Sequence, residues 1–239
     1  MKLALFVQAR ITSKRFPNKI LSEINGKKVI EILIKKLKKI KYFNKIVFLI
    51  PNTKKNKKLS KILKKLDVEI FKGSENNVLE RYYKAAKKYN AKNIIRVTSD
   101  CPLLDIKLSQ RIIKKYLSGN YNYVSNITPP TFPDGMDIEI FKFKTLEKAW
   151  KKSTTKSEKE HVTEYMRKNE KKKFNIKSKK NFSKIRITLD YKEDLILLRK
   201  IFNHFKPDIY FGLKEIINLN NKIPYWFNVN KKYIQNEKY

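Results

Sequence analysis

Cysteine, glycine and long apolar runs are all scarce in this 239-residue chain. The single cysteine, Cys101, excludes a disulfide within the chain and fits the reducing cytoplasm, where we expect the protein to reside. No apolar run approaches the ~20 residues that a membrane helix needs, so we expect no membrane span. The apolar start at residues 3–7 is short and leads into Gln8 and Arg10, which indicates a first β-strand and not a signal peptide.

Acidic residues are also few, because 22 Asp and Glu stand against 57 Lys and Arg and give a formal charge of +35. Such a charge would normally suggest a nucleic-acid-binding protein. The lysines, however, run through almost every segment, and abundant Asn, Ile and Lys beside five glycines are typical of A/T-rich coding bias. Nucleic-acid binding is therefore the weaker hypothesis. Only eight of the basic residues are arginine, so an arginine indicates a position where its planar guanidinium is needed.

The apolar pattern predicts an α/β protein. With 41% hydrophobic and 12% aromatic residues, the chain is expected to fold around a core. Strand-like runs alternate with amphipathic stretches, which is typical of a mostly parallel sheet. The predicted strands are residues 3–7, 45–50, 68–71, 93–98, 121–125 and 137–141, and the predicted helices are 29–40, 59–66, 78–89 and 109–116.

Beyond about residue 142 the pattern is less regular. Residues 145–151, 158–169 and 193–205 are helical in pattern, residues 173–177 and 185–189 look extended, and the tail from Pro224 is aromatic and irregular. We find no linker and no internal repeat in the sequence, so we predict one domain over residues 1–239.

The segment after the first predicted strand carries four cations: Arg10, Lys14, Arg15 and Lys19. Ligands of such sheets bind at the carboxyl ends of the strands. Backbone N–H groups, the hydroxyl of Ser13 and fixed positive charge together suit phosphate. We therefore interpret residues 8–19 as a site for a triphosphate or a pyrophosphate leaving group, with a solvated surface loop as the alternative. The glycine patterns of Walker and dinucleotide-binding loops do not occur in the sequence.

Two carboxylates end other predicted strands, Asp100 after residues 93–98 and Asp190 after residues 185–189. Carboxylates at strand ends are suitable ligands for Mg²⁺, and two of them meeting across one cleft could act on a triphosphate. The alternative for Asp100 is a cap or a turn. Three further acids are interpreted as helix caps or first-turn residues: Asp105, Glu193 and Asp194.

Residues 8–19, QARITSKRFPNK, resemble the signature Q-A-R-x-x-S-x-R-x-P-x-K of the cytidylyltransferases that activate acidic sugars. The match is most similar to the branch named after the spore-coat polysaccharide biosynthesis protein SpsF. Further pieces follow in order at residues 73–82, 96–102, 132–139, 160–163 and 186–194, so the similarity spans roughly residues 1–200.

The resemblance implies a single GT-A-like (nucleotide-diphospho-sugar transferase), Rossmann-like domain with a mostly parallel mixed sheet. It also implies transfer of CMP from CTP to an acidic sugar, with release of pyrophosphate and with Mg²⁺ as cofactor. Arg10, Arg15, Lys19 and Asp100 would then be catalytic, and Asp100 and Asp190 would hold the metal. The implied nucleotide-binding residues are Gln8, Ala9, Arg10, Ser13, Arg15, Lys19, Asn76, Arg81 and Ser99, with backbone groups of Gln8 and Ala9 reading cytosine.

The implied acceptor-binding residues are Asp134, Asp137, Glu139 and His161. The carboxylates would bind sugar hydroxyls, although residues 133–135 are also an ordinary turn signal. His161 would contact the acceptor or act as general base, and a packed or capping histidine is the alternative. A nonulosonate, an octulosonate or a smaller phosphorylated acid would each fit as acceptor.

Two positions depart from the family pattern, because relatives commonly have glycine where this chain has Thr12 and Asn18. Asn18 tolerates a left-handed conformation, whereas Thr12 is β-branched and is the larger change. A non-catalytic relative that binds a nucleotide or sugar therefore stays open as an alternative. The resemblance also implies a homodimer.

Overall fold

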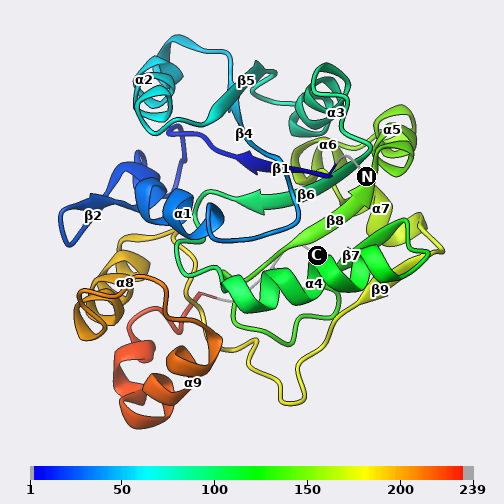
Figure 1. Ribbon diagram of the computed structural model, residues 1–239. Coiled ribbons are helices and arrows are strands. Elements are labelled where there is room, and N and C mark those ends of the chain that lie inside the picture. The colour runs from blue at the N-terminus through cyan, green and yellow to red at the C-terminus, as the bar shows by residue number, and fades with distance from the viewer. Residues whose placement is uncertain (1–2, 234–239) are drawn as a thin grey trace.

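The computed structural model describes residues 3–233 and is built on a seven-stranded sheet (Figure 1). In spatial order the strands are β5 (Glu69–Gly73), β4 (Lys45–Pro51), β1 (Leu3–Gln8), β6 (Asn93–Thr98), β8 (Glu139–Lys142), β7 (Tyr123–Ser125) and β9 (Lys173–Asn175). Only β8 is antiparallel to its neighbours among these strands. The carboxyl ends of β1 and β6 point toward the side of the molecule where α1 and α8 lie (Figure 1).

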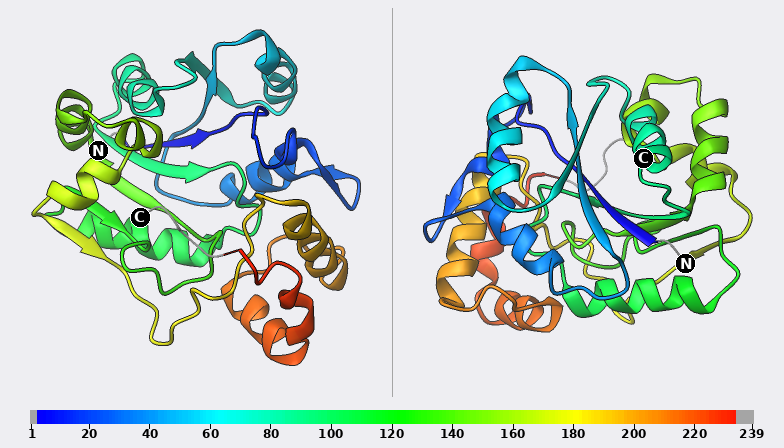
Figure 2. Two further views of the ribbon diagram at one scale, coloured as in Figure 1. Left: turned by 180° about the vertical axis from the view of Figure 1, so that it is seen from behind. Right: turned by 45° about the horizontal axis from the view of Figure 1, so that its top comes forward.

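Helices belong to both faces of this sheet (Figures 1 and 2). The core on one face takes side chains from α1 (Val29–Leu37), α2 (Lys57–Lys65), α4 (Ile106–Ser118), α8 (Lys192–His204) and α9 (Leu213–Lys222). The other face is covered by α3 (Val78–Lys88), α5 (Phe143–Lys152), α6 (Lys156–His161) and α7 (Glu164–Asn169). Side chains of a strand point alternately to the two faces of its sheet, and in β1 both faces are covered. Leu3, Leu5 and Val7 pack in the first core, and Ala4 and Phe6 pack in the second.

Short elements complete the chain. They are the hairpin β2 (Glu23–Ile24) and β3 (Lys27–Lys28), and the 3₁₀-helices η1 (Lys19–Leu21), η2 (Lys54–Asn56) and η3 (Pro224–Asn228). The hairpin turn is Asn25-Gly26, with φ of 49° and 73°, the conformation that this dipeptide favours. No helix within residues 3–233 is long and apolar enough to cross a membrane.

The predicted strands and helices up to residue 142 are confirmed within a few residues. Two later predictions are wrong. The helix predicted over residues 158–169 divides into α6 and α7, because Val162 adopts a positive φ of 59° between them. Residues 185–189 are extended but form no sheet strand, since the backbone N–H groups of Ile187 and Leu189 bond the carbonyls of Asp134 and Asp100.

A fully buried lysine joins α1 to the C-terminal helices. Lys36 is 0% exposed, and its Nζ donates to the carbonyl of Phe211 at 3.1 Å. Burial lowers the pKa of Lys36 to about 8, with Asp105 and Asp208 opposing that effect. The folded state therefore binds this proton less tightly than the unfolded state, so stability increases as the pH rises from about 8 toward the ordinary value of 10.5.

We expect Lys36→Met to increase the free energy of unfolding at pH 7 by roughly 1–3 kcal/mol, because it removes a buried charge but leaves the Phe211 carbonyl unbonded. The gain should shrink as the pH rises from about 8 toward 10.5. Thermal unfolding as a function of pH measures both effects. Lys35→Met, on the exposed side of the same helix, is the matched control. A loss of stability in Lys36→Met at pH 7 would contradict the expectation.

Candidate active site

One ammonium group joins the two carboxylates that follow predicted strand ends. Lys19 lies in η1, Asp100 follows β6, and Asp190 precedes α8. The Nζ of Lys19 is 2.7 Å from Oδ2 of Asp100 and 2.7 Å from Oδ1 of Asp190. The side chain of Lys19 is only 8% exposed. The structure thus brings together the cationic turn and the two acids, which are 81 and 171 positions away along the chain.

The electrostatics of this cluster favour its charged form. Burial alone would lower the pKa of Lys19, but Asp100 and Asp190 raise it above its ordinary value. Burial alone would raise the pKa of Asp100, but Lys19, assisted by Thr98, lowers it to about 2. Both groups are therefore ionised at neutral pH, because each supplies the charge that offsets the desolvation of the other.

Arg15 reaches the same acid from the open side. Its Nη2 is 2.8 Å from Oδ1 of Asp190, and its Nη1 donates to the hydroxyl of Tyr191 at 3.4 Å. The Tyr191 ring stacks on that of Tyr233, with centroids 3.6 Å apart and planes 2° from parallel. About half of the Arg15 side chain, 53%, is exposed, so its guanidinium is accessible to a ligand from solvent.

Arg186 organises the turn that carries Asp190. It donates to Asp134 at 2.7 Å, to Asp194 at 3.0 and 3.1 Å, and to Asp190 at 3.2 Å. Asp194 also accepts from the backbone N–H groups of Asp190 at 2.7 Å and Tyr191 at 2.9 Å. One cation therefore serves three acids. Burial and the neighbouring carboxylates raise the pKa of Asp134 to about 7, although Arg186 opposes this.

The predicted nucleotide-binding residues around β1 are close together, but their backbone groups are engaged in the sheet. The N–H of Ala9 donates to the carbonyl of Leu49, and the carbonyl of Gln8 accepts from the N–H of Ser99, each at 3.1 Å. The Ala9 N–H is thus not available to cytosine, which corrects that part of the prediction. The side-chain Oε1 of Gln8 is buried without a partner among the described residues. The hydroxyl of Ser13 accepts only a long bond, 3.5 Å, from Phe16.

Arg81 is the most unusual of these residues. It is 2% exposed, and its Nε and Nη1 are buried without a hydrogen-bond partner among residues 3–233. Burial, with Arg10 as a smaller cause, lowers the pKa of Arg81 to about 10. Such orphaned donors are costly and indicate a place for a polar ligand. Asn76 is exposed, whereas Asn77 caps α3 by accepting from the N–H of Glu80.

Of the predicted acceptor residues, Glu139 is in the wrong environment. It is 1% exposed, and it accepts a short hydrogen bond from Arg96 and another from Tyr123 at 2.5 Å. A carboxylate held in this way inside the α3–α5 side of the sheet is not available to sugar hydroxyls. Glu139 is a structural ion-pair partner, and we withdraw it from the acceptor site.

Asp137 and His161 keep their candidate roles. Asp137 is half-buried, and burial together with Asp134 and Glu139 raises its pKa well above the ordinary value. Burial lowers the pKa of His161, which favours the neutral imidazole that a base requires. The adjacent Glu160 pairs with Arg10 at 3.4 Å, so the α6 terminus faces the cationic turn.

The two departures from the family pattern are accommodated. Asn18 has φ of 59°, the left-handed conformation that asparagine tolerates. Thr12 is not among the described residues with positive φ, and its hydroxyl donates to Glu75 at 3.1 Å. Neither position therefore requires glycine for its own backbone conformation.

Gly135, in contrast, is at a position that strongly favours glycine. Its φ is +108°, and a Cβ there would lie 2.7 Å from the backbone N of Thr188. We expect Gly135→Ala to lower the free energy of unfolding by at least about 2 kcal/mol, because strain and a backbone clash add. Gly26→Ala, with φ of +73° and no atom within 4 Å, should cost only about 1 kcal/mol. Denaturant unfolding compares the two, and equal losses would contradict the clash.

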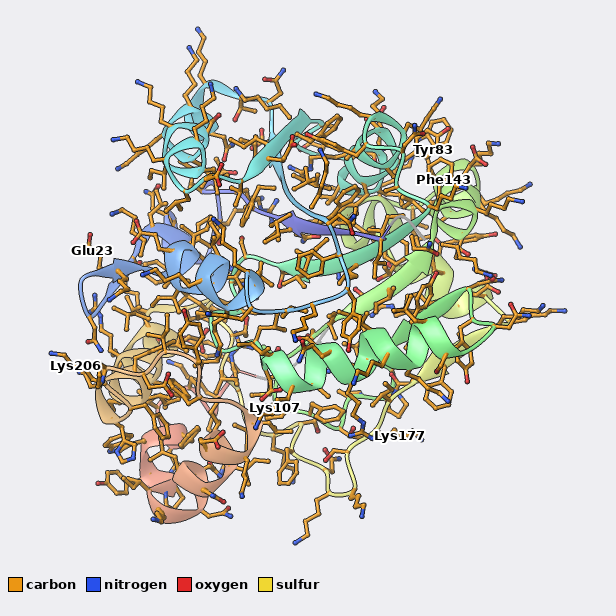
Figure 3. The ribbon with its side chains drawn as sticks, viewed as in Figure 1. Glu23, Tyr83, Lys107, Phe143, Lys177 and Lys206 are labelled. Atoms are coloured by element: carbon orange, nitrogen blue, oxygen red, sulfur yellow. The ribbon has the colours of Figure 1, made fainter. Side chains whose placement is uncertain are left out.

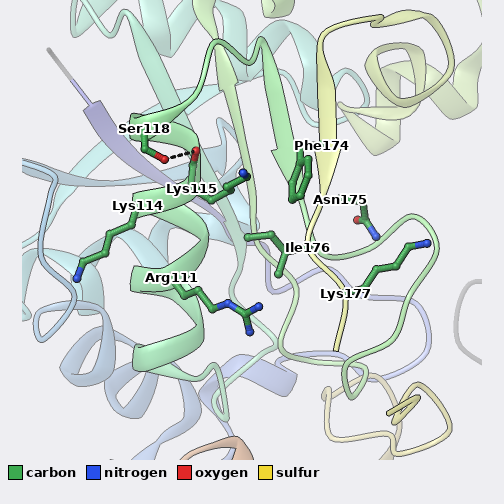
Figure 4. Close-up of a pocket in the computed structure, with 8 residues that line it drawn as sticks. All are labelled: Arg111, Lys114, Lys115, Ser118, Phe174, Asn175, Ile176 and Lys177. Carbon is green, nitrogen blue, oxygen red and sulfur yellow. Dashed lines mark hydrogen bonds between the residues drawn. The ribbon is translucent and has the colours of Figure 1, made fainter. Parts of the chain in front are cut away.

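A separate groove of about 650 Å³ lies between α4 and β9 (Figure 4). Its lining is cationic and apolar, with Arg111, Lys114, Lys115, Ser118, Phe174, Asn175, Ile176 and Lys177. None of the predicted site residues lines it, and it contains no carboxylate. It is therefore not the place of the chemistry proposed for Lys19 and Asp100.

Sequence reasoning gave no role to Arg186, Tyr191 or the C-terminal residues around Asn230. The scarcity of arginine is a signal that points to Arg186. The side-chain contacts of Asn230 with Asp194 and of Tyr233 with Tyr191 join segments more than 35 residues apart, and they leave no local pattern in the sequence.

The fold and the site define a nucleotidyltransferase of the GT-A-like, Rossmann-like class, with a mostly parallel mixed sheet. The chain belongs to the cytidylyltransferase family, whose model matches residues 4–231. The sequence is 34% identical to an uncharacterised protein of Methanocaldococcus jannaschii, over 98% of this chain and 97% of that one. It is 26% identical to the spore coat polysaccharide biosynthesis protein SpsF of Bacillus subtilis, over 93% and 95%.

Solved structures agree. A cytidylyltransferase from Leptospira borgpetersenii has a TM-score of 0.90 and 32% identity, with 95% of this chain and 97% of that chain covered. A CMP-2-keto-3-deoxy-manno-octonic acid synthetase complexed with CTP has a TM-score of 0.66 at 10% identity, with 86% and 100% covered, and shares the fold. The resemblance to the SpsF branch is thus confirmed, and the chain is a CTP-dependent cytidylyltransferase that moves CMP from CTP.

Proposed function

We propose that this enzyme transfers CMP to an acidic sugar, with Mg²⁺ as cofactor, for the synthesis of a surface glycan. The observation that carries the proposal is one cluster of two cations and two acids: Lys19 lies 2.7 Å from both Asp100 and Asp190, and Arg15 lies 2.8 Å from Asp190. Cations and carboxylates at one cleft are what a metal–triphosphate requires. The SpsF relative, which bears the name of a polysaccharide biosynthesis protein, supports the direction of the proposal.

The two carboxylates suit Mg²⁺. Their oxygens both lie 2.7 Å from one ammonium nitrogen, so they already converge on a single cation-sized position. Within residues 3–233 no group of three or more His, Cys, Asp or Glu side chains could hold a metal. Mg²⁺ is usually held by one or two carboxylates together with substrate phosphates, which matches a two-acid site. When bound, the ion would neutralise charge on the phosphates.

The chain's own groups have separate tasks in this proposal. Lys19 and Arg15 would bind the triphosphate and stabilise negative charge on the departing pyrophosphate. Asp137 and His161 would hold the acceptor hydroxyl, whose oxygen attacks the α-phosphorus while its proton passes to one of them. Catalysis would therefore depend mainly on positioning and electrostatics, without a covalent enzyme intermediate.

Pyrophosphate release tests the proposal directly. The assay contains CTP, Mg²⁺ and one acceptor at a time: a nonulosonate, an octulosonate, a smaller phosphorylated acid and neutral analogues of each. We expect turnover with an acid and none with its neutral analogue. CTP binding without turnover across the whole panel would instead favour the non-catalytic relative. Equal turnover with neutral acceptors would overturn the acidic-sugar assignment.

Nucleic-acid binding has less support. In the view of Figure 3, side chains with nitrogen tips project around the whole outline of the molecule. The expected homodimer stays a prediction, which sedimentation of the full chain would test.

Arg81 provides a test of where the nucleotide lies. We expect Arg81→Met to raise KM for CTP by about 10- to 100-fold, because a charge-assisted hydrogen bond is lost. The same change should raise the melting temperature, because it removes a buried guanidinium whose Nε and Nη1 have no hydrogen-bond partner among the described residues. Arg111→Met, on the exposed side of α4, is the control. A lower melting temperature with unchanged KM would show a purely structural arginine.

A further inference from the structure

The C-terminal segment, residues 230–233, lies against the turn that carries Asp190, although it is outside the motifs of the family resemblance. Asn230 is 1% exposed, which is rare for an asparagine without a specific partner. Its Nδ2 donates to Oδ1 of Asp194 at 2.8 Å and to the carbonyl of Arg186 at 3.1 Å. Both donors of this amide are thus used on one turn.

Those two contacts act at the centre of a hydrogen-bond network. Asp194, which Asn230 holds, accepts from the backbone N–H of Asp190 and from the guanidinium of Arg186. The same guanidinium donates to Asp190 at 3.2 Å. Asp190 is therefore held at its backbone N–H by Asp194 and at its carboxylate by Arg186, and Asn230 bonds both of these residues, through the side chain of Asp194 and the backbone carbonyl of Arg186. Without Asn230, a buried oxygen of Asp194 and a backbone carbonyl would each lose a donor.

A second contact from the same segment reaches the cationic side of the site. Tyr233 stacks on Tyr191, and the hydroxyl of Tyr191 accepts from Arg15. The Arg186 guanidinium lies 5.8 Å from the Tyr191 ring centroid and 5.9 Å from that of Tyr233. The segment thus supports both Asp190 and Arg15, which approach each other to 2.8 Å.

We propose that the segment formed by residues 230–233 is a C-terminal latch, in which Asn230 is a positioning residue that orients Asp190 through Asp194 and Arg186. This inference rests on the proposed role of Asp190 at the metal–triphosphate. Asn230 touches no reacting atom. Its effect is on the orientation of the Asp190 carboxylate, which must bind a cation within a narrow range of geometry.

Two substitutions at Asn230 separate hydrogen bonding from packing. Asn230→Ala removes both volume and the amide, whereas Asn230→Leu keeps the branched shape of the side chain and replaces the amide oxygen and nitrogen by methyl groups. If hydrogen bonding positions Asp190, both variants should lose about 10- to 100-fold in kcat, with a smaller change in KM for CTP. Asn228→Ala is the matched control, because Asn228 is exposed two residues away.

A readout without turnover distinguishes this inference from the proposed function. Titration with Mn²⁺ in the presence of CTP should give about 10-fold weaker metal binding for both Asn230 variants than for Asn228→Ala. Wild-type metal binding without turnover on any acceptor would contradict the proposed function but still allow this comparison. Wild-type turnover with an Asn230→Leu variant equal to Asn228→Ala would overturn the latch.

Tyr233→Ala is a second variant that tests the inference if the Asn230 variants do not fold. If circular dichroism shows that the Asn230 variants are unfolded, Tyr233→Ala still removes one contact of the latch, the stacking on Tyr191. Tyr233 is only half-buried, so we expect its loss to be tolerated. We expect a 3- to 10-fold loss in kcat with a melting temperature close to that of the wild type. Unchanged kcat in Tyr233→Ala, with the Asn230 variants unfolded, would reduce the segment to a structural role and overturn the inference.

Discussion

Asp100→Asn is expected to lower kcat for pyrophosphate release by about 10³-fold or more, with the fold intact. The substitution keeps the shape of the side chain but removes the charge that, in the proposed reaction, neutralises a cation on the triphosphate. A metal interaction of several kcal/mol corresponds to a factor of this size. Steady-state kinetics at saturating CTP and Mg²⁺ measure the loss.

The pH dependence of stability should change in the same variant. The pKa of Asp100 is lowered in the folded state, so its contribution to stability is present above its ordinary pKa of 3.8 and is lost as the pH falls toward about 2. Asp100→Asn should therefore unfold with a flatter acid limb than the wild type. Asp67→Asn, in an exposed turn, is the control. Retention of wild-type kcat in Asp100→Asn would exclude Asp100 from the metal site.

The fold class was predictable because burial determines the pattern of apolar residues in strands and helices. A strand with both faces covered is mostly apolar, as residues 3–7 of β1 are and as Ile94, Ile95 and Val97 of β6 are, and amphipathic stretches between such strands must cross back over the sheet. The carboxyl ends of parallel strands lie at the same edge of the sheet, so we expected Asp100 and residues 8–19, which follow two such strands, to lie close together. That expectation did not depend on any knowledge of the loops.

Asp190 was expected at the cleft for a reason that proved incomplete. The segment before it is extended, as its apolar residues suggest, but it bonds the backbones of Asp100 and Asp134 instead of a sheet neighbour. Local sequence cannot distinguish these two uses of an extended segment, because both need the same backbone conformation and the same buried side chains. Tertiary contacts, and not a sheet strand, thus place the Asp190 side chain at the predicted cleft.

Glu139 shows that the alternation of side chains along a strand predicts the side of the sheet on which a residue lies, but not whether that side is open to a ligand. Asp137 and Glu139 are two positions apart, in and just before β8, and alternation places the side chains of such positions on one side of a sheet. Whether that side is a cleft or a core depends on α5, α6 and α7, which cover Glu139 but leave Asp137 half-buried. The break at Val162 has a similar origin, because a positive φ at a β-branched residue is imposed by packing and not by propensity.

The cluster as a whole alternates charge in space. Arg15 and Lys19 meet Asp190, Asp190 meets Arg186, and Arg186 meets Asp134. In this arrangement Lys19 occupies the position between Asp100 and Asp190 that a divalent cation would take. Binding of Mg²⁺ with CTP would then require the ammonium to move from the carboxylates to the phosphates.

Lys19→Met is therefore expected to have two opposite effects. It should lower kcat by about 10²- to 10³-fold, because a charged contact to the leaving group is lost. It should also tighten binding of Mn²⁺ in the absence of nucleotide, because two carboxylates no longer share an internal cation and attract an external one more strongly. Lys14→Met, exposed five residues earlier, should show neither effect.

The direction of the metal effect decides between two roles for Lys19. If the ammonium competes with the metal, the dissociation constant for Mn²⁺ falls in Lys19→Met while turnover is lost. If the ammonium instead holds the carboxylates in place for the metal, both turnover and metal affinity fall together, since two buried anions without a counter-charge move apart. The second outcome would mean that Lys19 never leaves Asp100 and Asp190, and that Arg15, more exposed at 53% of its side chain, binds the triphosphate from the turn.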